Sequence, residues 1–199
     1  MSFYTGTQTE VLYAYANAST NLATFTTEDN LLKTYPPVFI PAGFFFNAGA
    51  TGKSLKVKAV GQLGTTSSPT FTWSVRLINA ASPPAWSAGG VLLGQTAATT
   101  AGATVTLAYW FIDLDITLRT IATGAASTVV TTGEVRGPAS LASPFSASIP
   151  ASNTTPAVST VDNSQAYFLY ISAACSASSA SNLINTQSLK VTARTKHDA

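Results

Sequence analysis

Apolar and polar residues alternate along several segments of this chain, which is the pattern of a β-strand with one buried side and one solvent-facing side. The longest such segment is 104–120. Its apolar side chains fall on even positions and its polar side chains on odd positions: Trp110, Ile112, Leu114, Ile116 and Leu118 against Asp113, Asp115, Thr117 and Arg119. Tyr109 and Phe111 break this alternation, which predicts that this end of the strand is covered on both faces or bulged.

Further strands are predicted at regular intervals, separated by clusters of Gly, Ser, Thr and Pro that favour turns. They are 54–63, 70–78, 127–136, 166–174 and 187–194. Residues 139–156 are of low complexity and contain proline, so we expect a long loop there. No helical periodicity of useful length is present. The sequence therefore predicts an all-β protein, a jelly-roll-like β-sandwich of about eight strands with an extended N-terminal arm.

The first 46 residues differ from the rest, which leads us to divide the chain into an arm, extended or a single strand, at 1–46 and a sandwich domain at 47–199. The arm is rich in aromatic residues: Tyr4, Tyr13, Tyr15, Tyr35, Phe44, Phe45 and Phe46. One interpretation places these rings in the core. The other leaves them exposed, where they would form the kind of patch that marks a protein interface. We take them as the candidate interface.

Charge is scarce, and this argues against catalysis and against several kinds of partner. Charged residues make up 9% of the chain, against roughly 25% in an ordinary soluble domain. The net charge of +2 is too weak to predict nucleic-acid binding, which needs a clustered basic surface. The apolar run 38–46 is too short for a membrane span. We expect no enzyme activity, no cofactor and no membrane or nucleic-acid partner.

A few residues are candidates for chemistry, each with a plainer alternative. Asp113 and Asp115 share a strand face and would meet one cation or one sugar, or else form a polar stripe that Arg119 neutralises. Lys56 and Lys58 would contact an acidic partner or form a solvated face. His197, three residues from the C-terminus, would serve in a catalytic dyad or triad only if packing held it, and the alternative is a frayed tail. Cys175 is interpreted as a small buried apolar side chain and not as a nucleophile. One cysteine excludes an internal disulfide and a multi-cysteine zinc site.

Three segments together resemble the jelly-roll structural proteins of tailed bacteriophages, especially phages of actinobacteria. The first is Gly52-Lys53-Ser54-Leu55-Lys56-Val57-Lys58-Ala59-Val60-Gly61 with the strand at 70–77, the second is 110–121, and the third is 167–191, which contains the run Ser176-Ala177-Ser178-Ser179-Ala180-Ser181-Asn182. The resemblance covers about 52–191 and leaves out the arm. The loops at 80–90 and 139–156 depart from the family pattern.

The resemblance implies a virion component, synthesised in the host cytoplasm. The first hypothesis is a capsid decoration (cement) protein on the capsid surface, a homotrimer whose aromatic arm grips the major capsid protein or a neighbouring subunit. The alternative is a minor tail or host-attachment protein of the same fold, binding glycans with Trp86 or Tyr109 as stacking rings beside Asp113 and Asp115. A third hypothesis is a carbohydrate-active enzyme using Asp113, Asp115 or Glu134.

Overall fold

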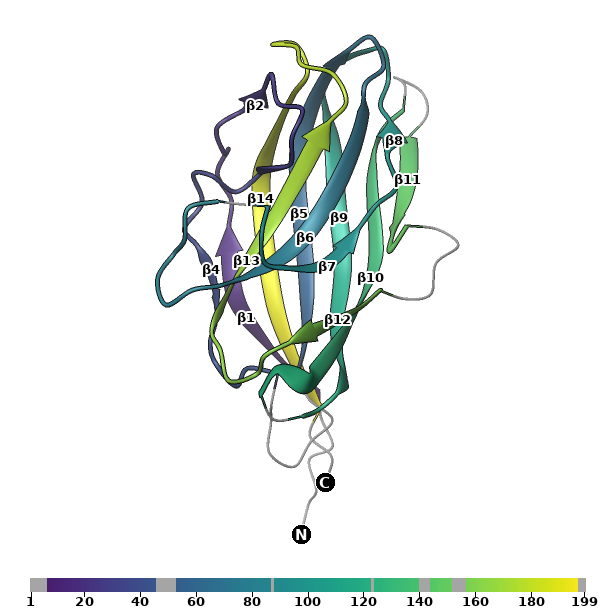
Figure 1. Ribbon diagram of the computed structural model, residues 1–199. Coiled ribbons are helices and arrows are strands. Elements are labelled where there is room, and N and C mark those ends of the chain that lie inside the picture. Colours follow the sequence, from purple (N-terminus) through teal and green to yellow (C-terminus); the bar gives the residue numbers. More distant parts are fainter. Residues whose placement is uncertain are drawn as a thin grey trace.

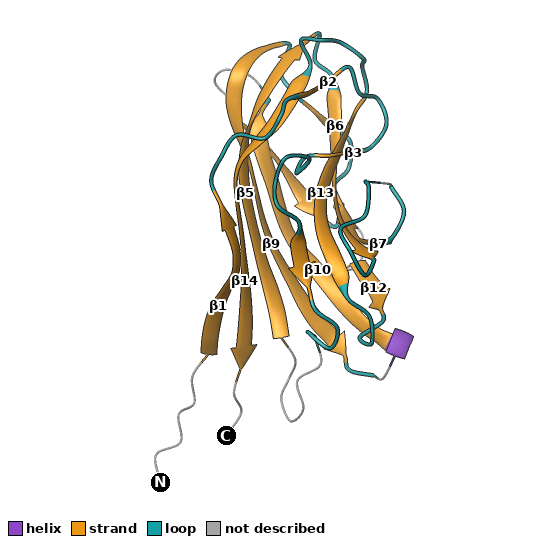
Figure 2. Cartoon of the chain, turned by 90° about the vertical axis from the view of Figure 1, so that its left-hand side faces the viewer, coloured by secondary structure: helices purple, strands orange, loops and turns teal. Residues whose placement is uncertain are grey.

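Two antiparallel β-sheets packed face to face form the molecule, which is shown as a computed structural model in Figures 1 and 2. The structure describes residues 7–45, 53–86, 88–122, 124–139, 144–151 and 157–196. Within these ranges the helical structure is one short 3-10 turn, η1 at Gly124–Ala126. The predicted all-β sandwich is confirmed.

The large sheet has eight strands, with β1, β14, β5, β9, β10 and β11 in that spatial order. Two short strands complete it, since β12 pairs with β10 and β2 pairs with β14. Their bounds are Thr7–Tyr15 (β1), Leu22–Ala23 (β2), Lys53–Thr66 (β5), Thr104–Thr120 (β9), Ser127–Pro138 (β10), Pro144–Ile149 (β11), Ala157–Val161 (β12) and Leu183–Lys196 (β14).

The small sheet has six strands, with β3, β13, β6 and β7 in that order, β4 also pairing with β13 and β8 with β6. Their bounds are Asp29–Asn30 (β3), Val38–Ile40 (β4), Thr70–Asn79 (β6), Val91–Gln95 (β7), Thr99–Thr100 (β8) and Tyr167–Cys175 (β13). Two strands pair with the same side of one neighbouring strand in four places, on β14, β10, β13 and β6. This sharing is why the described residues contain fourteen strands where the sequence pattern predicts about eight.

The core lies between the sheets and is built from the inward side of each alternating strand. On β9 the even positions from Trp110 to Leu118 are buried, as the pattern predicts. Trp73 on β6 and Trp110 on β9 are fully buried. The indole of Trp110 donates to the backbone oxygen of Asn185, 3.1 Å away, so its one polar atom is satisfied inside the core.

The N-terminal segment differs from the expected separate arm, because residues 7–45 contribute strands to both sheets. β1 and β2 pair with β14, while β3 and β4 pair with β13. The physical reason is burial of apolar side chains: Leu31, Tyr35, Val38, Ile40, Phe44 and Phe45 all belong to the main core. Residues 7–45 are therefore part of the two sheets and their shared core, not a separate arm.

The aromatic residues proposed as an interface mostly face the chain's own core. Tyr35, Phe44 and Phe45 are buried, and Tyr13 and Tyr15 are half-buried against the same cluster. The Tyr15 ring meets the Tyr35 ring edge-on at 4.7 Å between centroids. Burial, with the neighbouring tyrosines, raises the pKa of both Tyr13 and Tyr35 to about 12. Tyr4 and Phe46 lie outside the described residues.

Candidate functional site: the outer face of the large sheet

Two rows of outward-pointing side chains run side by side on the solvent face of the large sheet. Because β5 and β9 are antiparallel partners in register, each residue of one row sits opposite one of the other. We call these residues the β5–β9 face: Lys56 opposite Asp115, Lys58 opposite Asp113, Val60 opposite Phe111, and Gln62 opposite Tyr109. One half of the face is therefore ionic and the other half is mainly apolar.

In the ionic half, two lysines and two aspartates form a closed network. The Lys56 Nζ lies 2.6 Å from Asp113 Oδ1 and 2.9 Å from Asp115 Oδ2. The Lys58 Nζ lies 3.2 Å from Asp113 Oδ2. The expectation that Arg119 neutralises these acids was wrong, because the lysines of the neighbouring strand do so, with Arg194 3.8 Å from Asp115.

The lysines of this network favour the ionised form of the Asp113 carboxylate. Burial acts to raise the pKa of Asp113, but hydrogen bonds and charge from Lys56 and Lys58 outweigh it and lower that pKa. Hydrogen bonds to Asp113 and Asp115 raise the pKa of Lys56. An acid–base pair needs environments that push two pKa values apart, and this arrangement neutralises the two acids instead.

The other half of the face exposes large apolar side chains to solvent. Tyr109 is 68% exposed, Leu107 45%, and Val60 and Phe111 36% each. The Arg136 guanidinium lies 5.4 Å from the centre of the Phe111 ring, which is a cation–π contact. Beside the patch, the Gln187 side-chain amide donates to Gln62 Oε1 at 3.3 Å.

Leu107 reaches the surface through an irregular turn of the backbone. The register between β5 and β9 shifts between Leu63 and Thr65, and Leu107 has φ of 49°. This left-handed conformation is uncommon for a residue other than glycine. The predicted bulge at this end of the strand is therefore present, whereas Tyr109 and Phe111 are exposed within the chain rather than covered on both faces.

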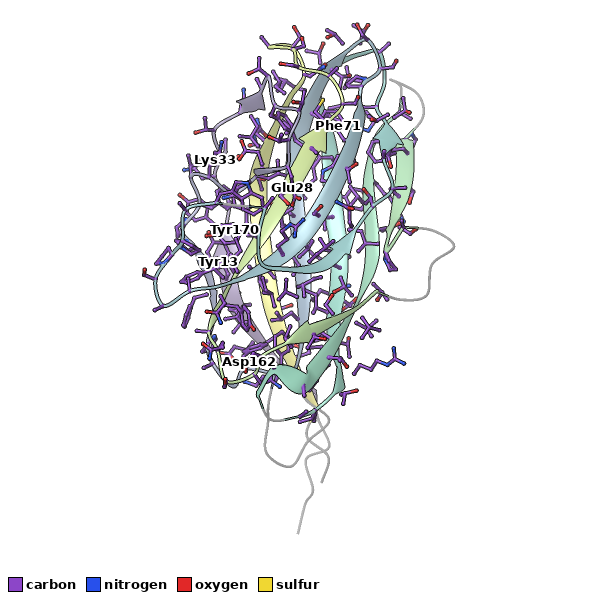
Figure 3. The ribbon with its side chains drawn as sticks, viewed as in Figure 1. Tyr13, Glu28, Lys33, Phe71, Asp162 and Tyr170 are labelled. Atoms are coloured by element: carbon purple, nitrogen blue, oxygen red, sulfur yellow. The ribbon has the colours of Figure 1, made fainter. Side chains whose placement is uncertain are left out.

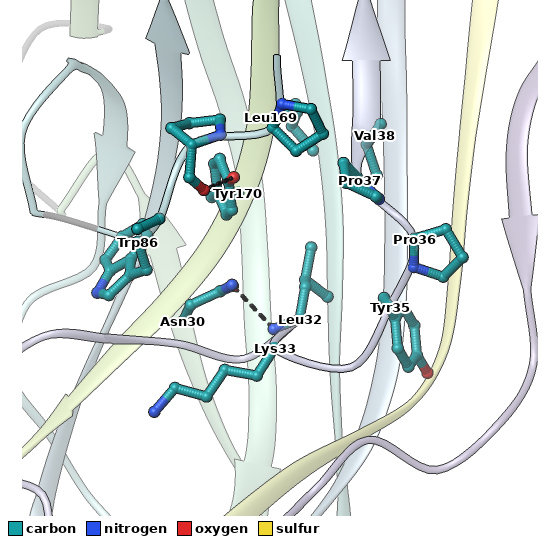
Figure 4. Close-up of a pocket in the computed structure, with 13 residues that line it drawn as sticks. Asn30, Leu32, Lys33, Tyr35, Pro36, Pro37, Val38, Trp86, Leu169 and Tyr170 are labelled. Atoms are coloured by element: carbon teal, nitrogen blue, oxygen red, sulfur yellow. Dashed lines mark hydrogen bonds between the residues drawn. The ribbon is translucent and has the colours of Figure 1, made fainter. Parts of the chain in front are cut away.

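A cleft of about 310 Å³ lies on the opposite side of the molecule, over the outer face of the small sheet (Figure 4). Prolines 36, 37, 83 and 84 line it together with Trp86 and Tyr170. The Trp86 and Tyr170 rings are tilted at 5.5 Å between centroids, and the Tyr170 hydroxyl donates to the Pro84 oxygen at 3.1 Å. Trp86 and Tyr109 thus belong to the outer faces of different sheets and do not form one site.

Glu28 ties the N-terminal segment to the small sheet next to this cleft (Figure 3). Arg76 of β6 donates from Nε to Glu28 Oε1 at 2.7 Å and from Nη2 to Oε2 at 2.8 Å. Ser172 of β13 donates to Oε1 at 2.5 Å. Burial acts to raise the pKa of Glu28, but these hydrogen bonds and the Arg76 charge outweigh it and the pKa is lowered.

The remaining candidates are structural or lie outside the description. Cys175 is buried, as predicted, and burial raises the pKa of its thiol. Glu134 pairs with Arg136 and accepts a hydrogen bond from Ser146. His197 lies outside the described residues. Among the residues that are described, no cluster of three or more His, Cys, Asp or Glu side chains is arranged to hold a metal ion.

Sequence reasoning found Tyr109, Asp113 and Asp115 but missed the face as a whole. Lys56 and Lys58 were identified as a basic pair, and Val60 and Phe111 were given no role. The signal that unites them is the register between β5 and β9, which a single sequence does not contain.

In the described part of the chain, no helix has the length and apolar character that crossing a lipid bilayer requires.

No protein-family model and no curated protein matches this chain. Among solved structures, the chain is similar to the CBM2 module of the evolved Dit of Lactobacillus casei BL23 phage J-1. The identity is 10% and the TM-score 0.37, over 97% of this chain and 99% of that one. At this score and identity, no property of that module is carried over to this protein.

Proposed function

We propose that this chain is a non-enzymatic structural protein of a bacteriophage particle. In this proposal it is a capsid decoration protein that binds the major capsid protein, associates with copies of itself and stabilises the head from the capsid surface. The observation that carries the binding role is the exposed apolar cluster on the β5–β9 face, with Tyr109 at its centre. The particle assignment rests on the resemblance of three sequence segments to phage structural proteins.

Physical chemistry supports a binding role for this cluster. Contiguous exposed apolar side chains rimmed by polar ones mark interaction sites on soluble proteins. Tyrosine, phenylalanine and arginine are enriched at the centres of such interfaces, and Tyr109, Phe111 and Arg136 adjoin one another here. The scarcity of charge in the whole chain reduces the cost of removing water from a large contact area.

The same face gives no support to catalysis by Asp113 or Asp115. Both carboxylates are occupied by lysine ammonium groups within the chain. Glu134, the third acid considered for an enzyme, is paired with Arg136. A structural role for these acids therefore follows more directly from their partners than a role in sugar hydrolysis.

The proposal is tested on particles of the phage that encodes the chain. Gold-labelled antibody is expected to decorate heads and leave tails unlabelled in electron micrographs. Purified chain is expected to bind heads stripped of it, and Tyr109→Ser, by weakening the association of copies with one another, is expected to weaken this binding at least about tenfold. Phe39→Ser, a change at an exposed ring on β4 of the small sheet, is the matched control. Particles without the chain would overturn the proposal.

One observation favours a second candidate, a glycan-binding tail or host-attachment protein. The Tyr109 ring is largely free to stack on a sugar, and the Gln62 amide beside it is suited to hydroxyl groups. This candidate predicts label on the tail, signals on a glycan array and their loss in Tyr109→Ala. A silent array together with labelled heads would reject it.

A further inference from the structure

We propose that the β5–β9 face pairs with the same face of a second copy of this chain, about a two-fold axis parallel to the strands and midway between β5 and β9. This inference deepens the proposed function and rests on its use of this face as an interface. It names the partner, a second copy, and the geometry of the contact. Both follow from how charge is distributed across the strands.

Four charged side chains form one row across four neighbouring strands. Lys190 of β14 pairs with Lys58 of β5, which pairs with Asp113 of β9, which pairs with Glu134 of β10. The row thus reads cation, cation, anion, anion. Each of the four points to the solvent side of the sheet: Lys190, Lys58 and Asp113 each lie between two buried residues, and Glu134 precedes the buried Val135.

A two-fold axis through the middle of this row sets the cations of one copy opposite the anions of the other. A half-turn about an axis along the strands keeps each residue at the same height along the strand direction. It places β5 of one copy over β9 of the other, and β14 over β10. Lys58 of one copy then faces Asp113 of the other, and Lys190 faces Glu134. A two-fold contact must be self-complementary, and this row meets that condition for all four charges.

The neighbouring rows agree with the same axis. Lys56 faces Asp115 on one side of the charged row, and Val60 faces Phe111 on the other. Gln62 then faces the exposed Tyr109, so that the apolar half of each copy covers the apolar half of its partner. Complementary potentials across a contact set its register and exclude wrong partners.

The alternative two-fold axis, running across the strands, is disfavoured by the same charges. It would stack β5 on β5 and β9 on β9. Lysines 56 and 58 of one copy would then meet those of the other, and Asp113 and Asp115 would meet their own counterparts. Like charges placed together across an interface cost several kcal/mol, so the distribution selects the axis along the strands.

The face is large enough for a specific contact. Four strands at about 4.8 Å each span roughly 19 Å, and the stretch from Ser54 to Gln62 is roughly 30 Å long at the rise of an antiparallel strand. The footprint is therefore roughly 600 Å² in projection, of the order of the roughly 800 Å² that each partner contributes to a standard interface. Two sheets stacked in this way lie about 10 Å apart.

The test uses two full-length variants with opposite faces. The acidic variant carries Lys58→Glu and Lys190→Glu, and the basic variant carries Asp113→Lys and Glu134→Lys. Each alone sets like charges against each other, so we expect its self-association, measured by analytical ultracentrifugation, to weaken at least about tenfold. An equimolar mixture restores all four cross-copy pairs and is expected to form a one-to-one complex. Repulsion within each chain is unchanged by mixing, so recovery reports contact between copies.

A matched control separates this contact from general attraction between oppositely charged proteins. Lys33→Glu with Lys53→Glu makes the same change in net charge but leaves the β5–β9 face native. Mixed with the basic variant, it is expected to give no one-to-one complex. Near-ultraviolet circular dichroism checks that each variant is folded. Tyr109→Ser, which alters no charge, provides an independent variant and is also expected to weaken pairing.

The unmodified chain supplies the measurements that overturn the inference most directly. Analytical ultracentrifugation is expected to give a molar mass of about twice the 20.5 kDa of one chain. A measured mass of one chain at a concentration of about 100 µM would overturn the pairing. A mass of three chains, as a homotrimer requires, or a mixture that fails to associate would overturn the axis. If the chain paired in solution but was absent from phage particles, the proposed function would be rejected and the pairing would stand. If labelled heads carried the chain as single copies, the pairing would be rejected and the proposed function would stand.

Discussion

At the scale of single residues, Glu28 shows how one ionised group fastens a segment of the chain. Its carboxylate accepts two hydrogen bonds from Arg76 and one from Ser172, which lie on neighbouring strands of the small sheet. The Glu28 and Arg76 side chains are 14% and 13% exposed, so water screens this pair poorly. A charge held this way depends on its partners, and removing one of them leaves the other buried without compensation.

We therefore predict that Glu28→Gln lowers the free energy of unfolding by about 3 kcal/mol. Chemical denaturation of the parent chain and the variant at pH 7 measures this difference in the free energy of unfolding. Glu10→Gln, a change at an exposed glutamate on β1, is the control and is expected to change stability by less than about 0.5 kcal/mol. Equal stability of the two variants would contradict the role assigned to Glu28.

The same contact predicts a pH dependence with a definite sign. The pKa of Glu28 is lowered in the folded chain from its ordinary value of 4.5. Its contribution is therefore fully present above about pH 4.5 and is lost as the pH falls through the lower, folded-state pKa. The stability difference between the parent chain and Glu28→Gln is expected to shrink as the pH falls below 4.5.

At the scale of elements, the sequence predicts strands well where one face is buried and the alternation is long. The segment predicted at 104–120 coincides with β9, and those at 70–78 and 127–136 agree with β6 and β10 within two residues. The alternation is visible there because one side of each strand meets the core and the other meets water.

Elements that depend on contacts distant in sequence escaped prediction. β2 and β3 are two residues long and exist only through pairing with β14 and β13. β11 lies inside 139–156, where low complexity predicts a loop, and its Phe145 is buried against Trp73 of the opposite sheet. The pairing of Lys58 with Asp113 likewise required the register between two strands that are far apart in sequence.

The β4 region gives a matched pair of substitutions that test whether the N-terminal segment is part of the core. Phe45 is 2% exposed and Phe39 is 49% exposed. We predict that Phe45→Ala lowers the free energy of unfolding by about 3–5 kcal/mol, and that Phe39→Ala lowers it by about 1 kcal/mol or less. Denaturant titration measures both, and a small loss for Phe45→Ala would restore the idea of a detachable arm.

At the scale of the whole molecule, the N-terminal segment and the sandwich are expected to unfold together. β4 pairs with β13, an inner strand of the small sheet, through residues 38–40 and 167–169. The side chains of Val38 and Ile40 sit in the same cluster as Leu169 and Ile171. Segments that share both backbone pairing and a core open as one cooperative unit.

Amide hydrogen exchange tests this coupling directly. The amides of β4 that bond to β13 are expected to exchange with an opening free energy within about 1 kcal/mol of those in β13, because both require global unfolding. β1 is the internal comparison: it lies at the edge of the large sheet, its register shifts between Val11 and Tyr13, and it is expected to exchange sooner. If β4 exchanged as fast as β1 while β13 stayed protected, the segment would be an independently released strap, and its removal would leave the sandwich folded.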